Sequence, residues 1–315
     1  MPYRNRMTFS LVASPSVRLL RALLLGGGCL LSLACGDSSS DAPPDDGTPG
    51  DGMPVDGMPV DGMPGERHLG AIGVQLYTVR VAMQSDFEGT LRRLAEMGYR
   101  EVEFAGLFGR DPAQVRSLLA ELNLTAAGSH VDWSRFRDDP TGAIDETLAL
   151  GAQYLVFPWT PDSERQTLDQ WHGWAARLNE VAAESRDRGL PVAYHNHDFE
   201  FQPIEGTLPY DVLVAELDPN LVDFELDLYW LAKAGGDASA LFASQPGRFP
   251  LTHVKDLRRS DQAIVDVGQG DLDFAAIFAQ SAQSGMRHFI VEHDSSADPM
   301  QTAQTSIEYL QQLAF

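Results

Sequence analysis

Four short segments in the second half of the chain each place a residue that can bind a metal at the end of an expected strand. The segments are Tyr194–Asp198, Glu225–Trp230, Thr252–Asp256 and Val291–Asp294, and the residues in question are His195, Asp227, His253 and Glu292. Expected strands and helices alternate around them, so the strand ends should meet on one rim of a sheet or barrel. This pattern predicts a mononuclear metal enzyme built on a (β/α) barrel.

The period of two along a strand decides which side chains face the barrel axis. The inward sets are His195 with His197, Asp223 and Glu225 with Asp227, His253 with Lys255, and Ile290 with Glu292. Charged groups inside a barrel are costly unless they are paired or bound to a metal. Glu225 lies deeper than Asp227, so we expect it to support a ligand or the fold rather than to bind the metal.

Each of these residues has a plainer interpretation when it is taken alone. A single histidine at a strand end is more often a hydrogen-bonded structural residue than a ligand. Asp227 alone could cap a loop, and Glu292 alone could pair with Lys255 or Arg287. Their joint occurrence on four successive strands is what favours a metal site.

The strands and helices expected in the domain alternate strictly. Expected strands are 71–77, 100–105, 125–130, 154–159, 192–197, 221–228, 251–256 and 288–293, and the clearest helices are 86–97, the one opened by Asp111-Pro112, 143–150, 168–188 and about 300–313. Eight such units favour a closed TIM barrel over an open sheet. No Gly-x-Gly-x-x-Gly turn follows the first strand, which argues against a dinucleotide-binding fold.

Further candidates for substrate binding lie near the same rim. Inward-facing polar residues on the first three strands, tryptophans just beyond strand ends and polar neighbours of the ligand candidates make up this set: Gln75, Glu103, His130, Trp159, Asn196, His197, Trp230 and Asp256. The tryptophans are either core aromatics or rings that stack on sugar faces, and the sequence leaves both interpretations open.

The N-terminus has the features of an export signal. Four arginines precede or begin a run from Leu19 to Ala34 that carries no acidic residue, and Ala34-Cys35-Gly36 offers a small-residue cleavage site. Such a segment is typical of a signal peptide rather than a membrane span. Residues 1–35 also resemble a bacterial lipoprotein signal, which predicts lipidation of Cys35 and a location in the cell envelope. An ordinary secreted or periplasmic protein is the alternative.

Residues 36–67 are predicted to be a disordered linker, because Pro, Gly and Asp recur there in an Asp-Gly-Met-Pro repeat that cannot bury enough apolar surface to fold. The remaining 68–315 has the usual size of one TIM barrel. After Cys35 the chain has no cysteine, so this domain must fold without disulfides.

The charge of the chain restricts its partners. The formal net charge is −22, and removal of residues 1–34 with their four arginines takes it to −26. A protein this acidic should repel nucleic acid and anionic lipid, so membrane attachment would depend on the lipid anchor alone.

The domain resembles the xylose-isomerase-like TIM-barrel superfamily, in the branch of sugar phosphate isomerases/epimerases. The resemblance covers nearly all of 70–313 and is carried by Gly73–Tyr77, Val102–Gly106, Ser129-His130, Tyr194–His197, His253–Asp256 and Val291–Asp294. In that family one divalent metal binds at the ends of strands five to eight, commonly to Glu, Asp, His and Glu. Carried over by position, the resemblance implies His195, Asp227, His253 and Glu292 as ligands.

This chain departs from the family at strand five, where His195 stands in place of the usual glutamate. Relatives use that glutamate and the strand-eight glutamate as an acid/base pair, so only Glu292 of the pair is present here. Glu292, His197 and Lys255 are therefore the candidate catalytic residues. Two nitrogen ligands also favour Mn, Fe, Co or Zn over Mg.

The resemblance implies proton abstraction next to a metal-bound carbonyl of a small sugar, and a sugar isomerase or epimerase is the first expectation. The same enolate would allow a 3-keto-glycoside lyase or hydrolase, which is the close alternative. A catalytically silent surface sugar-binding protein is the alternative of another class. The sequence does not identify the sugar or the oligomeric state.

Overall fold

The computed structural model describes residues 60–61 and 67–315. The expected signal peptide, Cys35 and nearly all of the expected linker lie outside these residues. Val60–Asp61 (β1) pairs with Arg67–His68 (β2) in a short antiparallel ladder.

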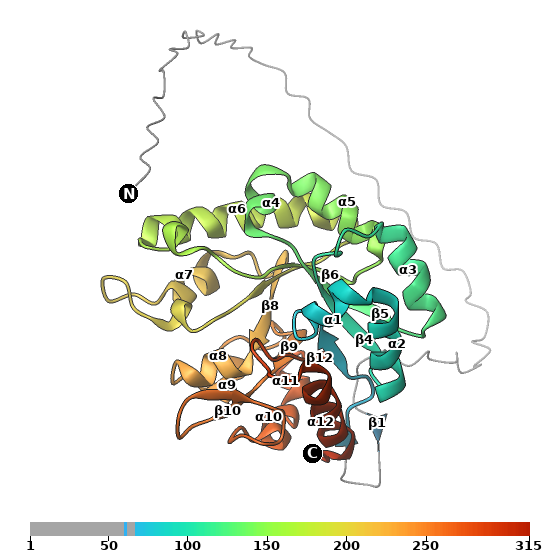
Figure 1. Cartoon of the computed structure of the whole chain (residues 1–315). Coiled ribbons are helices and arrows are strands. Elements are labelled where there is room, and N and C mark those ends of the chain that lie inside the picture. Colours follow the sequence, from blue (N-terminus) through green and yellow to red (C-terminus); the bar gives the residue numbers. More distant parts are fainter. Residues whose placement is uncertain (1–59, 62–66) are drawn as a thin grey trace, which may run out of the picture. The chain divides into compact units, whose positions relative to one another are not determined.

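Eight parallel strands close into a barrel in the order β12-β3-β4-β5-β6-β7-β8-β9 (Figure 1). The strands are β3 (Gly73–Gln75), β4 (Glu101–Ala105), β5 (Thr125–His130), β6 (Tyr154–Phe157), β7 (Val192–His195), β8 (Val222–Asp227), β9 (Leu251–Val254) and β12 (His288–Val291). The prediction of a TIM barrel is confirmed. Several strands end earlier than the sequence predicts: β7 ends at His195, β9 at Val254 and β12 at Val291.

Helices surround the barrel, as Figure 1 shows. They are α1 (Arg80–Ser85), α2 (Phe87–Met97), α3 (Pro112–Glu121), α4 (Trp133–Asp138), α5 (Pro140–Leu150), α6 (Leu168–Asp187), α7 (Pro209–Glu216), α8 (Leu228–Lys233), α9 (Ala238–Ser244), α10 (Phe274–Phe278), α11 (Ser281–Ser284) and α12 (Pro299–Gln312). Local signals set their ends: the Asp111 side chain accepts a hydrogen bond from the Gln114 amide at the start of α3. Gly98 ends α2 at a φ of 113°, a conformation that glycine adopts without strain.

A hairpin that the sequence did not predict follows β9. It consists of β10 (Asp256–Arg258) and β11 (Ala263–Val265). The buried Asp256 carboxylate accepts hydrogen bonds from the backbone amides of Gly268 and Gly270, both at 2.9 Å. Asp256 therefore fixes the loop that follows the hairpin.

The side chains inside the barrel change from apolar to charged along the barrel axis. A small apolar cluster fills one part of it: Ala127, Tyr154, Val156, Ala193, Leu251 and Ile290. His195, His253 and Glu292 each follow a member of this cluster by two residues, so the strand alternation places them on the same inward face, nearer the carboxyl ends of the strands. The apolar cluster thus packs directly below a layer of charged side chains inside the barrel. Within residues that the structure describes, no helix is long and apolar enough to cross a membrane.

Candidate metal centre and substrate pocket

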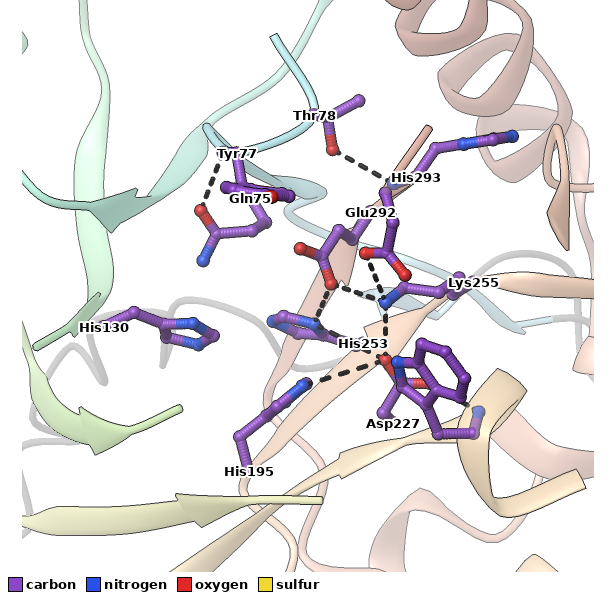
Figure 2. A network of polar contacts seen from close by, with 12 residues as sticks. Gln75, Tyr77, Thr78, His130, His195, Asp227, His253, Lys255, Glu292 and His293 are labelled. Carbon is purple, nitrogen blue, oxygen red and sulfur yellow. Dashed lines mark hydrogen bonds and ion pairs between the residues drawn. The ribbon is translucent and has the colours of Figure 1, made fainter. Parts of the chain in front are cut away.

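The four predicted metal ligands meet at the carboxyl ends of β7, β8, β9 and β12. One ligand atom from each of His195, Asp227, His253 and Glu292 lies within 4.8 Å of the others, and all four residues are buried. Asp227 Oδ2 is 3.9 Å from His253 Nδ1 and 4.0 Å from His195 Nε2. Figure 2 shows these side chains converging on one point. The strand alternation alone was sufficient to predict this convergence.

The charges around this point favour a divalent cation. Among the described residues, the carboxylates of Asp227, Glu292 and Asp294 all lie within 3.0 Å of a single ammonium, Lys255 Nζ. These three carboxylates outnumber the two cationic groups beside them, Lys255 and the protonated His253 that contacts Glu292, which leaves an excess of negative charge away from water. Asp227 Oδ2 is also buried without a well-oriented hydrogen bond within the described part of the chain. The residues present therefore fit a bound divalent metal.

The protonation states of the ligands are unequal. Burial, together with the charge of His253, lowers the pKa of His195 to about 3, so its imidazole is neutral, as a metal ligand must be. Burial opposes a charge on His253, but Glu225 and Glu292 outweigh it and raise its pKa well above the usual value. Burial raises the pKa of Asp227 to about 6 despite the nearby Lys255. A metal would have to displace a proton from His253.

Lys255, a predicted catalytic residue, lies against the carboxylates of the candidate metal centre. Its side chain is buried, and its ammonium lies 2.9 Å from Asp227 Oδ2 and 2.7 Å from Glu292 Oε2. Burial lowers its pKa, but these carboxylates outweigh that effect and hold the pKa well above its ordinary value. An ammonium has no lone pair for a proton, so the geometry favours Lys255 as the charge partner of the carboxylates.

A second layer of polar side chains lies on the inner side of the two ligand histidines. Glu103 Oε2 is 2.6 Å from His253 Nε2, and Glu225 Oε2 is 3.1 Å from His195 Nδ1. His130 Nε2 joins both acids, at 2.7 Å from Glu225 and 3.1 Å from Glu103. Glu225 thus supports the ligands, in agreement with the expectation from its depth.

A pocket of about 560 Å³ opens above the metal centre. Its lining includes Glu292, His195, His197 and His130, together with rim residues that the sequence did not single out as site residues: Tyr77, Asp132 and Asp294. Tyr77 and Trp159 also line the pocket. Each is 42% exposed, a high exposure for a large aromatic side chain. Asp294 was missed although it sits two residues after Glu292, because two-residue spacing beyond a strand end does not fix orientation.

His197 is held rigidly in this pocket. Its ring stacks on Phe199 with centroids 5.3 Å apart, and its backbone amide donates to Glu200 Oε2 at 2.8 Å. Burial lowers the pKa of His197 well below its usual value, and the nearby Lys255 ammonium acts in the same direction. His197 is therefore a neutral imidazole, and its lowered pKa makes it a weak proton acceptor.

The other predicted substrate-binding residues are not part of the pocket lining. Asn196 Oδ1 accepts the backbone amide of Asp227 at 3.0 Å, and the Trp230 amide donates to Asp227 Oδ1 at 2.8 Å. Asp256 binds its own loop, as described above. Gln75 donates to the fully buried Glu103 at 2.9 Å. These contacts show what the residues do within the protein, and their contact with a substrate stays a prediction.

Comparison with known proteins places these features in a family. The model of the xylose isomerase-like TIM barrel family matches residues 91–313. An inosose dehydratase from Lactiplantibacillus plantarum is 30% identical over 275 residues, which cover 74% of this chain and 90% of that protein. An inosose dehydratase from Geobacillus kaustophilus is 24% identical over 266 residues, 71% of this chain and 86% of its own length.

Solved structures share the fold. A sugar phosphate isomerase/epimerase from Parabacteroides distasonis superposes with a TM-score of 0.67 at 22% identity, over 77% of this chain and 98% of that one. An L-ribulose 3-epimerase superposes with a TM-score of 0.60 at 18% identity, over 76% of this chain and 92% of that one.

Proposed function

The chain belongs to the xylose isomerase-like TIM barrel family, and we propose that it removes a proton next to the carbonyl of a small polyhydroxylated ketone and then expels an oxygen leaving group. Its curated relatives are sugar-modifying enzymes, so an enzymatic function of this class follows for the chain. The proposal concerns which reaction it performs and which residues perform it.

The observation that supports this proposal best is the cluster of four candidate ligands, two of which, His195 and Glu292, line the pocket. A metal held there by His195, Asp227, His253 and Glu292 would polarise the carbonyl oxygen and stabilise the negative charge of an enolate. With two imidazole and two carboxylate ligands, we propose Mn, Fe, Co or Zn rather than Mg. The adjacent pocket has the size of a site for a sugar or glycoside.

Glu292 is the proposed proton carrier. Its Oε2 is engaged by Lys255 Nζ at 2.7 Å and His253 Nδ1 at 2.8 Å, which leaves Oε1 for the proton. In an elimination, Oε1 takes the proton from the carbon beside the carbonyl, the C–H electrons form the enolate, and the oxygen on the next carbon leaves with the bond electrons. The proton on Oε1 then passes to that oxygen. One carboxylate is sufficient, consistent with His195 in place of a second glutamate.

Elimination is placed ahead of isomerisation because of the relative that is 30% identical, which is a dehydratase. This reverses the order expected from the sequence. The leaving group would be water from a free sugar, or an alcohol from a 3-keto-glycoside. Isomerisation or epimerisation remains the second candidate, because the neutral His197 imidazole lines the same pocket and gives it a second proton acceptor.

A product analysis separates these reactions. The metal-loaded protein is incubated in deuterated water with inososes, 3-keto-glycosides and simple ketoses, and the products are followed by NMR. The proposal predicts exchange at the carbon next to the carbonyl, followed by an unsaturated product and a released water or alcohol. An isomer or epimer of unchanged mass apart from the label would establish the second candidate. Binding without exchange would indicate a catalytically silent sugar-binding protein.

We also propose that the protein acts in the cell envelope, anchored through a lipid on Cys35. The export-type N-terminal sequence supports this location, and the net charge of −22 offers no attraction to nucleic acid or anionic lipid.

A further inference from the structure

His253 lies between two carboxylates that contact opposite sides of its ring. Its Nδ1 is 2.8 Å from Glu292 Oε2 in the metal centre, and its Nε2 is 2.6 Å from Glu103 Oε2 on the inner side. Both His253 and Glu103 are fully buried, so no solvent competes for these contacts. The nearest carboxylate to each ring nitrogen is therefore a different one, although Glu225 Oε2 also lies 3.3 Å from Nε2.

His195 has a looser version of this arrangement with the ring reversed, because its Nδ1 makes no well-oriented hydrogen bond among the described residues. Its Nε2 faces Asp227 Oδ2 at 4.0 Å, and its Nδ1 lies 3.1 Å from Glu225 Oε2. His130 completes the inner layer, because its Nε2 lies 2.7 Å from Glu225 Oε2. We use "inner layer" for Glu103, Glu225 and His130, and "outer layer" for Asp227 and Glu292.

A neutral imidazole carries one N–H and one lone pair, so a histidine cannot give both nitrogens to metals at once. The carboxylate that accepts its N–H decides which nitrogen keeps the lone pair. With Nε2–H directed to Glu103, His253 presents Nδ1 to the outer layer. If the N–H of His195 is on Nδ1, the nitrogen nearest to Glu225, His195 presents Nε2 to the same point.

The spacing within the two layers supports this division. The shortest inner contacts, 2.6 Å for His253 to Glu103 and 2.7 Å for His130 to Glu225, have the length of charge-assisted hydrogen bonds. Asp227 Oδ2 is 3.9 Å from His253 Nδ1, too far for a hydrogen bond but suitable for two ligands of one ion. The inner group of His130, His195, Glu225 and His253 also falls within 4.8 Å, so it is the competing position for an ion.

We propose that Glu103 and Glu225 are positioning residues that set the tautomers of His253 and His195, and so direct a single ion to the outer layer. This inference rests on the metal site of the proposed function, and it makes no assumption about the sugar. It assigns to Glu103 a role that differs from direct substrate binding.

The tautomers can be read directly in the unmodified protein. In full-length protein labelled with ¹⁵N at histidine and loaded with zinc, long-range ¹H–¹⁵N NMR should show His195 protonated at Nδ1 and His253 protonated at Nε2. The opposite tautomer at either residue would overturn the proposal. If zinc does not bind the unmodified protein, the metal site of the proposed function fails instead, so the two failures are distinguishable.

Matched variants supply the second test. Glu103→Gln and Glu225→Gln should each weaken zinc binding roughly 10- to 100-fold in a chelator competition, because a neutral amide is a poorer acceptor for the imidazole N–H. Glu101→Gln is the control: Glu101 lies on the same strand as Glu103, is equally buried, and contacts His288 Nδ1 at 2.9 Å, which is not a ligand. It should leave zinc affinity unchanged.

Two outcomes would overturn the proposal in this second test. One is zinc affinity in Glu103→Gln and Glu225→Gln no weaker than in Glu101→Gln. The other is loss of zinc in His130→Gln with retention in Asp227→Asn, which would place the ion in the inner layer. Circular dichroism checks that each variant is folded, and the NMR measurement on the unmodified protein decides the question if a variant is not.

Discussion

Glu225 and Asp227 lie one pleat apart on β8 and face opposite sides of the same two histidines. Glu225 Oε2 contacts His195 Nδ1 at 3.1 Å and His253 Nε2 at 3.3 Å, whereas Asp227 Oδ2 faces the other nitrogen of each ring. A strand repeat of two residues therefore places one carboxylate on each side of the two candidate ligand histidines. Both acids are fully buried, within the charged layer of the barrel.

Replacement of Glu292 should stop proton abstraction. Glu292→Gln removes the carboxylate oxygen that takes the proton, and we expect the rate of C–H exchange with deuterated water to fall on the order of 10²- to 10⁴-fold. The measurement is NMR of the substrate with protein whose metal content has been restored. Rapid exchange in the metal-replete variant, together with its loss in His197→Asn, would assign the base to His197.

Trp159 should contribute to substrate binding rather than to the core. Its ring lines the pocket and is 42% exposed, so Trp159→Ala should raise KM about three- to tenfold with little change in kcat. Val81→Ala is the control, because Val81 is 69% exposed and lies outside the pocket lining. An unchanged KM in steady-state kinetics would show that the indole has only a structural role.

Glu200 should make the stability of the domain depend on pH. Burial raises its pKa from 4.5 to about 7, although Tyr194 and the His197 amide donate hydrogen bonds to it. Between these values the folded protein holds a proton that the unfolded chain has released, so the free energy of unfolding falls as pH rises through this window. The loss should be on the order of 3 kcal/mol.

The test is denaturant unfolding at pH 5 and pH 8. Glu200→Gln cannot titrate and should remove most of this difference, while Glu180→Gln, at an exposed position, should retain it. Equal pH dependence in the unmodified protein and in Glu200→Gln would show that another group is responsible.

Cys35 should determine where the protein is found in the cell. If the residue is acylated, Cys35→Ser should release the protein from the membrane fraction or block its processing. Cell fractionation and mass spectrometry of the mature N-terminus provide the measurement. An unacylated N-terminus with unchanged fractionation would leave the secreted form as the correct interpretation.

The sequence was sufficient to predict the barrel and the convergence of its four candidate ligands, because both depend on local periodicity. The repeat of two placed His195, Asp227, His253 and Glu292 on one face of consecutive strands, and the alternation with helices placed those strand ends together. Caps such as Asp111 and stops such as Gly98 fixed helix ends through contacts within a few residues.

Some features of the site could not be predicted from the sequence, because they depend on contacts between residues that are far apart in the chain. The contacts of the Lys255 ammonium with the carboxylates of Asp227, Glu292 and Asp294 could not be predicted, and the catalytic role of Lys255 stays a prediction. The hydrogen bonds that Asp256 accepts from the amides of Gly268 and Gly270, 12 and 14 residues away, could not be predicted either, and its contact with a substrate stays a prediction. Neither partnership follows from periodicity, because loop conformation sets both.

The metal content of the purified protein tests the central claim most directly. Elemental analysis should find about one divalent transition-metal ion per chain in the unmodified protein, and Asp227→Asn and His253→Ala should each lose most of it, since each removes a ligand from the buried quartet. Glu101→Gln, which changes a buried acid that is not a ligand, should keep the full complement. Full stoichiometry in both Asp227→Asn and His253→Ala would contradict the assignment of the metal centre.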